Sequence, residues 1–88
     1  MVRGRALRRA ESRAEKAERI VQEELARHGW KEDDLSRRKK GDPAKVRVAQ
    51  RLREETMVTL GWIAARLHMG GVAHLNNRLY LLRQGRPK

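Results

Sequence analysis

Residues 59–82 read TLGWIAARLHMGGVAHLNNRLYLL, and this stretch decides the fold that the sequence predicts. Thr59 is a favoured N-cap for a helix over residues 60–68, in which Ala64 leaves room for a second helix to cross closely. Gly70 and Gly71 then predict a tight turn. A second helix is expected over residues 72–83, and its apolar stripe consists of Val72, Leu75, Leu79 and Leu82. Two short helices joined in this way predict a helix-turn-helix, with a helical hairpin that binds no DNA as the alternative.

The other face of the helix over residues 72–83 carries side chains that can read base edges. In a helix-turn-helix the recognition helix presents its N-terminal residues to the major groove. Asn bonds adenine with two hydrogen bonds, and Ala touches the thymine methyl group. The alternative is that both Asn residues are tolerated surface amides. The predicted base contacts are Ala73, His74, Asn76, Asn77, Arg78 and Tyr80.

Three further helices are expected upstream of this pair. Asp42 and Pro43 are typical of a helix start and predict a helix over residues 43–55, followed by a loop at residues 56–58. The acidic residues that follow Trp30 predict a short helix of two turns before Gly41. Residues 5–27 lack glycine and proline and predict a long helix that ends at Gly29.

The long helix is predicted to lie mostly in solvent and to touch its own domain along one edge, because its apolar stripe is narrow and rich in alanine. The stripe consists of Leu7, Ala10, Ala14, Ala17, Val21 and Leu25. The alternative is a helix that docks on a partner protein or on a second copy of the chain. No strand pattern and no internal repeat occurs in the sequence. The expected fold class is all-α: a long helix in residues 1–29, a helix-turn-helix domain of three to four helices in residues 30–84, and a basic tail at residues 85–88.

The charge of the chain indicates a polyanionic partner. The 88 residues include 22 Lys and Arg against 11 Asp and Glu, which gives a formal net charge of +11. Residues 36–53 carry eight of these basic residues with one acid, and residues 59–88 carry five with none. Such a basic domain is typical of nucleic-acid binding, although a charge run is often only a solvated face. The predicted phosphate contacts are Arg37, Arg38, Lys39, Lys40, Lys45, Arg47 and Arg51.

Several classes of function are disfavoured by the same composition. There is no Cys, and the three His residues form no metal-ligating pair, so we expect no metal, no cofactor and no enzymatic activity in this chain. No apolar run is long enough to span a membrane, and no apolar signal-peptide core follows the first arginines. A cytoplasmic, nucleoid-associated protein is therefore expected. Only three aromatic residues are present, which disfavours binding by base stacking.

Residues 41–70 read GDPAKVRVAQRLREETMVTLGWIAARLHMG, and this stretch resembles the C-terminal extension of the REP-associated tyrosine transposases. The segments at residues 16–20 and 23–30 are similar to the linker helix of that family, so the resemblance covers about residues 14–82. Its most specific parts are LRxET at residues 52–56 and WIAxRLxMG at residues 62–70. The family's catalytic domain and its His-hydrophobe-His motif are absent, and no tyrosine lies in a matching context. The resemblance therefore implies a DNA-targeting helix-turn-helix extension and no catalytic residue.

These observations together predict sequence-directed binding of double-stranded DNA by a helix-turn-helix, as the DNA-targeting part of a transposase-related protein. Such a chain is a fragment, a remnant or a free-standing module. Two alternatives remain open at this point. One is a helical interaction or dimerisation module that uses residues 7–25, and the other is a piece of a single-strand transposase whose catalytic domain is missing.

Overall fold

The computed structural model describes residues 12–85 and contains five helices. They are α1 (Arg13–His28), α2 (Glu32–Arg37), α3 (Pro43–Glu55), α4 (Leu60–Arg66) and α5 (Val72–Arg83). No strand occurs between residues 12 and 85, so the predicted all-α class is confirmed. The first part of the predicted long helix, residues 5–11, and the end of the basic tail lie outside the described residues.

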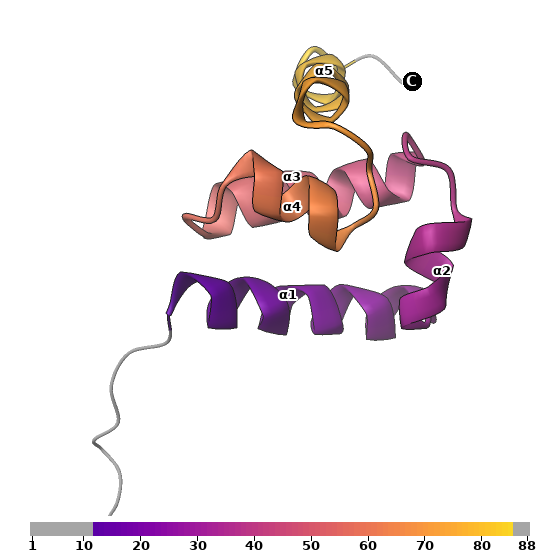
Figure 1. Cartoon of the computed structure of the whole chain (residues 1–88), viewed down its shortest axis with the longest axis vertical. Helices are drawn as coiled ribbons and strands as arrows, with labels where there is room; N and C mark the ends of the chain where they lie inside the picture. Colours follow the sequence, from indigo (N-terminus) through magenta and orange to yellow (C-terminus); the bar gives the residue numbers. More distant parts are fainter. Residues whose placement is uncertain (1–11, 86–88) are drawn as a thin grey trace, which may run out of the picture.

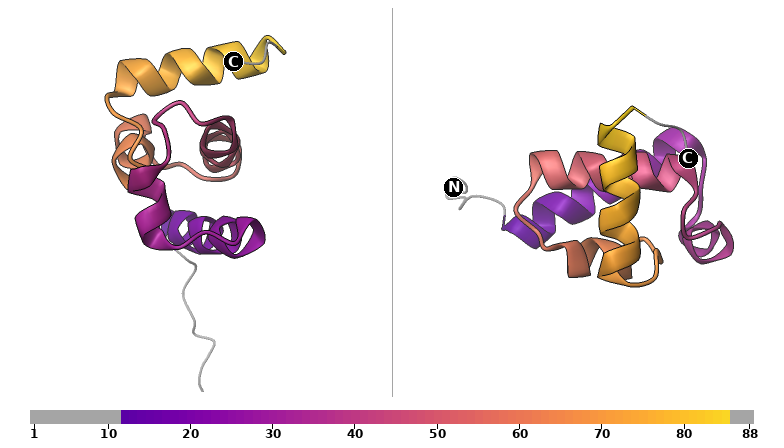
Figure 2. Two further views of the ribbon diagram at one scale, coloured as in Figure 1. Left: turned by 90° about the vertical axis from the view of Figure 1, so that its right-hand side faces the viewer. Right: turned by 90° about the horizontal axis from the view of Figure 1, so that it is seen from above.

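The helices form three layers (Figures 1 and 2). α1 makes one outer layer, α3 and α4 lie side by side in the middle, and α5 crosses over them on the opposite side from α1. α3 contacts α1, α4 and α5, and α4 also packs against α5. The short α2 connects the α1 layer to the start of α3 at one end of the molecule. α1 and α5 therefore present their outer faces to opposite sides.

Local sequence signals account for where the helices begin and end. Asp42 accepts hydrogen bonds from the backbone N–H groups of Ala44 and Lys45 at the start of α3. Thr59 accepts one from the N–H of Trp62 at the start of α4. Gly29 ends α1 in the left-handed conformation, with φ of 72°. Each of these groups satisfies a backbone donor or acceptor that the helix itself leaves open.

A single hydrophobic core joins all five helices. Its fully buried members on the α4–α5 side include Ile63, Leu67, Leu75 and Leu79, as the apolar spacing predicts, and half-buried Trp62 packs against them. Met69 is also fully buried, although its place in the predicted turn gave no indication of this. The buried side chain of Met69 fixes the segment between α4 and α5 to the core.

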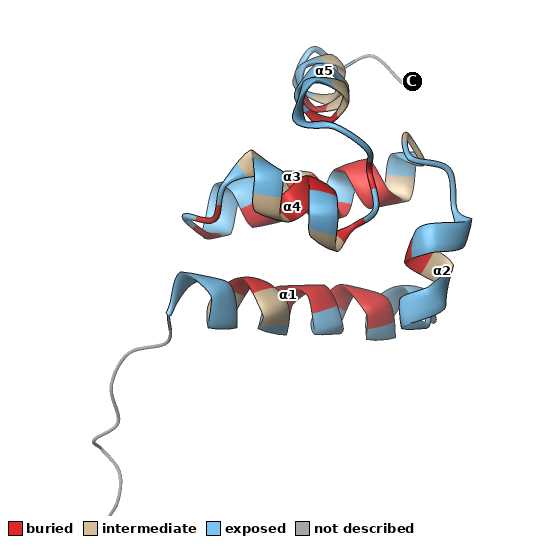
Figure 3. Ribbon diagram, in the orientation of Figure 1, coloured by how far each residue is buried: buried red, intermediate tan, exposed pale blue. Residues whose placement is uncertain are grey.

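Nine of the sixteen residues of α1 are exposed, and the helix packs against its own domain along one side, as predicted. Ala17, Ile20, Val21 and Leu25 are buried in the same core as α3 (Figure 3). Ile20, which lies outside the predicted alanine stripe, supplies much of the apolar volume. Residues 13–28 and residues 30–84 therefore pack as one unit, and the chain's own α3 covers the face that was considered for a partner.

Candidate nucleic-acid interface

The segment that joins α4 to α5 holds the two helices in a fixed relation. α4 ends in a left-handed turn in which the N–H of Met69 donates to the carbonyl of Ala64 and the N–H of His68 to that of Ala65. His68 occupies the left-handed position with φ of 55°, and Gly70 follows with φ of 80°. Because Met69 is buried, this short turn cannot swing freely, and it sets the direction in which α5 leaves the core.

α5 buries one side and exposes the other. Leu75 and Leu79 are fully buried, whereas Ala73, Asn76, Asn77 and Tyr80 are exposed. Val72, which the spacing placed on the buried stripe, is 44% exposed, because it stands at the first position of α5 beyond the end of the core. These four side chains lie on the exposed side of α5, and their contact with bases stays a prediction.

His74 and Arg78, the other two predicted base contacts, lie at a half-buried edge of α5. They are one helical turn apart, and His74 Nε2 and Arg78 Nε are both buried without a hydrogen-bond partner. Arg78 packs so closely on the backbone of Gly41 that a methyl group added there would lie 2.9 Å from Nε. Arg78 thus faces the loop between α2 and α3 rather than the open outer face of α5.

That loop carries the basic run at residues 37–40. The side chain of Arg38 is held within the protein: its Nε donates to Asp42 at 2.8 Å, and its guanidinium stacks over Trp30 at 4.3 Å. Lys39 and Lys40 are exposed and meet no carboxylate within residues 12–85. The stem of Lys40 lies against the turn before α5, where a methyl group added to Gly70 would be 3.2 Å from Lys40 Cδ. The fold therefore places the basic run beside both the start and the middle of α5.

Lys45 does not contact phosphate, contrary to the prediction from its charge. Its side chain is fully buried, and Nζ donates to the backbone carbonyls of Leu35 at 2.8 Å, His68 at 3.0 Å and Arg38 at 3.5 Å. Burial lowers the pKa of the ammonium group, because the charged form loses its hydration. The role of Lys45 is to hold α2, the basic run and the turn after α4 onto α3.

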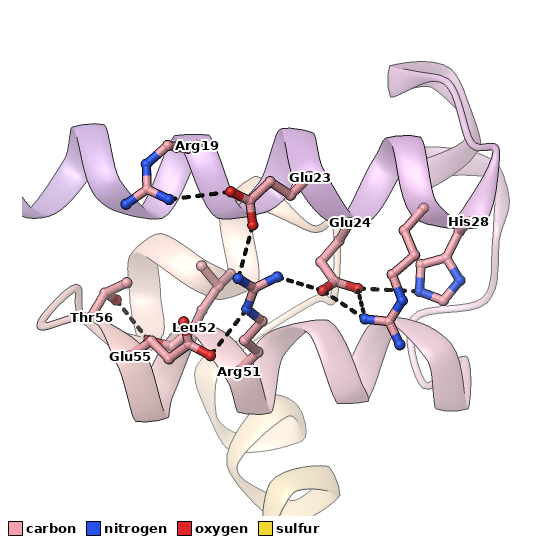
Figure 4. Close-up of polar contacts among 9 residues, drawn as sticks. Arg19, Glu23, Glu24, His28, Arg51, Leu52, Glu55 and Thr56 are labelled. Carbon is pink, nitrogen blue, oxygen red and sulfur yellow. Dashed lines mark hydrogen bonds and ion pairs between the residues drawn. The ribbon is translucent and has the colours of Figure 1, made fainter.

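Arg51 is the second correction among the predicted phosphate contacts. Its guanidinium binds Glu23 at 2.8 Å, Glu24 at 2.7 Å and Glu55 at 3.1 Å (Figure 4). These carboxylates come from α1 and from the end of α3, and Glu24 is buried. Arg51 therefore joins α1 to α3, and its charge is already balanced by carboxylates rather than open to a phosphate. Arg37 forms only a long ion pair with Asp33, at 3.8 Å, and Arg47 is exposed, so both stay predictions.

Arg66 makes a second ionic bridge that the sequence did not reveal. It binds Glu18 of α1 and Glu32 of α2, each at 2.8 Å, and the pKa of each of these carboxyl groups is lowered chiefly by the hydrogen bond from Arg66. No local sequence pattern indicates this bridge, because its three residues are 14 to 48 positions apart in the chain. The bridges of Arg51 and Arg66 neutralise acidic side chains on the side of α1.

The opposite side of the molecule is correspondingly basic. No acidic residue occurs anywhere in residues 56–85, so α4 and α5 carry only Arg66, Arg78 and Arg83 as formal charges. Asp42 is the one acid in residues 36–53, and its oxygens are occupied by Arg38 and by the N-terminal N–H groups of α3. An approaching polyanion would therefore meet uncompensated positive charge at α5 and at the neighbouring basic run.

Comparisons with models of known protein families, with curated proteins and with solved structures find no match to this chain. The resemblance to the REP-associated tyrosine transposases thus rests on the sequence motifs alone. Within the described part of the chain, no helix is long and apolar enough to cross a membrane. In the same residues no His, Asp and Glu side chains are grouped so that they could hold a metal ion.

Proposed function

We propose that this protein binds double-stranded DNA through α4 and α5, which act as a helix-turn-helix with α5 as the recognition helix. The observation that carries the proposal is the position of the basic run. Lys40 lies against the turn that precedes α5, and Gly41 lies against Arg78 in its middle. Candidate phosphate contacts therefore lie next to the helix that carries the candidate base contacts, which supports a DNA-binding surface at this place.

The dimensions of α5 agree with insertion into the major groove. Twelve residues make a helix about 18 Å long, and the groove is about 12 Å wide and admits a helix. Asn76 and Asn77 stand in the middle of the exposed side, where each amide can bond an adenine edge. Ala73, near the N-terminus of α5, can contact a thymine methyl group. The exposed side of α5 thus offers both hydrogen-bonding and apolar contacts to bases.

The relation to the REP-associated tyrosine transposases is part of this proposal. The motifs at residues 52–56 and 62–70 fall on the end of α3 and on α4 with its following turn, which are the elements that orient α5. A DNA-targeting extension would need this framework and no catalytic residue. We therefore propose that the chain directs a transposase-related activity to its DNA site.

The test begins with selection of a preferred duplex from a random pool, followed by fluorescence anisotropy titrations on the selected and a scrambled duplex at several salt concentrations. Asn77→Ala should cost about 1–3 kcal/mol on the selected duplex and far less on the scrambled one. Alanine is the better helix former, so this variant keeps α5 intact. Lys39→Ala should weaken binding to both duplexes equally and lower the salt slope by about one unit.

Lys31→Ala is the matched control for charge. Lys31 is exposed in the segment between α1 and α2, and this segment lies in the layer away from α5 (Figure 1). Its removal changes the net charge as much as the removal of Lys39. It should leave the salt slope unchanged within about half a unit. If the wild-type chain binds neither duplex at low salt, or if Lys31→Ala and Lys39→Ala weaken binding alike, α5 and the basic run are not the DNA-binding surface.

A further inference from the structure

We propose that Arg78 and Lys39 form a binding pocket for a single DNA phosphate, and that Gly41 is the positioning residue of this pocket. The inference rests on the proposed function and changes the role of Arg78 from a base contact to a backbone contact. Such a contact fixes the register of the recognition helix on the duplex without reading sequence.

The pocket is a hollow at the edge of α5. It has a volume of about 350 Å³ and is lined by Lys39, Gly41, Asp42, Pro43 and Arg78. Its two cations come from different elements, since Lys39 belongs to the loop after α2 and Arg78 to the middle of α5. An anion held between them would therefore connect the loop to the recognition helix.

The guanidinium of Arg78 differs from those of Arg51 and Arg66 in lacking an acceptor. Arg51 and Arg66 each bind two or more carboxylates, whereas no side chain or backbone oxygen within residues 12–85 accepts a hydrogen bond from Arg78. Its Nε is buried, which makes a missing acceptor costly. A guanidinium that is partly dehydrated and unpaired is suited to a phosphate, which accepts bidentate hydrogen bonds.

Asp42 is the one carboxylate at the pocket, and it does not oppose an anion there. One oxygen accepts from the N–H groups of Ala44 and Lys45, and the other accepts from Nε of Arg38 at 2.8 Å. These bonds lower the pKa of the Asp42 carboxyl group and balance its charge locally. Asp42 also caps the first N–H groups of α3, so the pocket depends on its two cationic side chains and not on the helix terminus.

Gly41 is required because of the space that Arg78 occupies. A Cβ atom at this position would lie 2.9 Å from Nε and 3.2 Å from Cζ of Arg78, closer than van der Waals contact allows. The long side chain of Arg78 can move away, so Gly41→Ala should keep the fold and displace only the guanidinium. This substitution therefore removes the phosphate contact without changing the charge of the protein.

The experiment measures salt-dependent binding of three variants on the selected and scrambled duplexes. Arg78→Met keeps the apolar stem of the side chain and removes the charge, and Gly41→Ala displaces it. Both should weaken binding to the two duplexes by the same factor and lower the salt slope by about 0.9. As a result, a fourfold rise in salt should weaken wild-type binding roughly 3.5-fold more than it weakens either variant. Gly29→Ala is the control, because Gly29 ends α1, outside the proposed DNA-binding helices, and a Cβ atom there meets nothing within 4 Å.

A second measurement locates the phosphate. The selected duplex is prepared with one neutral methylphosphonate in place of a phosphate, and the replacement is moved along both strands. Wild-type binding should fall at the phosphate that occupies the pocket, and Arg78→Met should be insensitive to replacement at that position only. Thermal unfolding of each variant shows whether its fold is intact.

The outcomes separate this inference from the proposed function. If Arg78→Met loses affinity on the selected duplex alone, Arg78 reads a base: the pocket is refuted and DNA binding stands. Normal binding by Gly41→Ala, with weak binding by Arg78→Met, refutes the positioning role of Gly41 and hence the pocket as proposed. If the wild-type chain binds no duplex, the proposed function fails and the inference fails with it.

Discussion

Replacement of the buried Lys45 by methionine should destabilise the protein strongly, although lysine is usually a tolerant surface residue. Lys45→Met keeps most of the side-chain volume and removes the ammonium group. In the native structure that group donates to the carbonyls of Leu35 and His68 at 2.8 and 3.0 Å, with a longer contact to Arg38. The variant would leave these carbonyls without their donor in the interior.

The expected magnitude follows from the two short bonds. A hydrogen bond that involves a charged group contributes about 1.5–3 kcal/mol, and the third contact at 3.5 Å adds little. Against this, the variant avoids the cost of burying a charge, which the lowered pKa of Lys45 reflects. We expect a net loss of about 2–4 kcal/mol from a total near 5 kcal/mol or somewhat more, with a fall in Tm of about 10 °C or more.

Urea unfolding followed by circular dichroism measures this loss, with Lys39→Met as the matched control. The control makes the same chemical change at an exposed position of the basic run and should shift stability by less than about 0.5 kcal/mol. If the two variants unfold at the same urea concentration, the buried ammonium is not the link between α2, the turn after α4 and α3, and the explanation given for its burial is wrong.

Three further predictions concern the core, a helix end and the acid sensitivity. Ile63→Ala should cost about 2–5 kcal/mol in the same unfolding assay, because its side chain is fully buried; an unchanged midpoint would contradict the single core. Gly29→Ala should cost about 1 kcal/mol because φ at this position is 72° and alanine is strained there, although its Cβ atom would meet no neighbour; an unchanged midpoint would contradict this. Arg66 lowers the pKa of Glu18 below 4.5, so its stabilisation is present above about pH 4.5 and is lost as the pH falls through the lowered value. Arg66→Met should therefore be less stable than the wild type at pH 7, and its free energy of unfolding should fall less between about pH 5 and 3. If the free energy of unfolding falls by the same amount in both proteins over that range, the bridge is refuted.

The helices that the sequence predicts best are those whose ends carry local chemical signals. Asp42 followed by Pro43 predicts the first residue of α3, and Gly71 predicts the residue before α5, both as the structure has them. Such signals act between neighbours in the chain, so they can be recognised without knowledge of the fold. The end of α4 is less well predicted, because His68 occupies a left-handed position that usually belongs to glycine.

The burial of α1 was only partly predicted in this way. Ala17, Val21 and Leu25 belong to the apolar stripe that the spacing predicts and are buried, whereas Ile20 lies outside the stripe and is buried as well. Alanine permits close approach of α3, and this approach also buries Ile20 beside the stripe. Whether such a face is covered depends on residues 25 to 30 positions later in the chain, and no local pattern contains that information.

The same limit explains why the charges of Lys45 and Arg51 predicted phosphate contacts that the fold does not support. Lys45 lies three, four and seven residues before Val48, Ala49 and Leu52, on the buried side of α3. Its position on the helix therefore indicated its burial better than its residue type did. Arg51 gave no such indication, because its partners Glu23 and Glu24 are on another helix. A count of charges along the chain thus overstates what is free to meet DNA, and only the fold shows which cations are already paired.

The residues that hold the basic run in place are as important to the proposed function as the run itself. A flexible run of four cations would lose conformational entropy when it bound, and part of the binding energy would be spent on ordering it. Here Arg38 is fixed by Asp42, and Lys40 lies against Gly70. The buried Lys45 binds the backbone carbonyl of Leu35 just before the run and that of His68 in the turn after α4. Lys39 is therefore presented beside α5 before any ligand arrives. If this is the reason for the buried lysine, Lys45→Met should weaken binding to selected and scrambled duplexes alike, at a temperature where the variant is still folded, while leaving the preference between them unchanged.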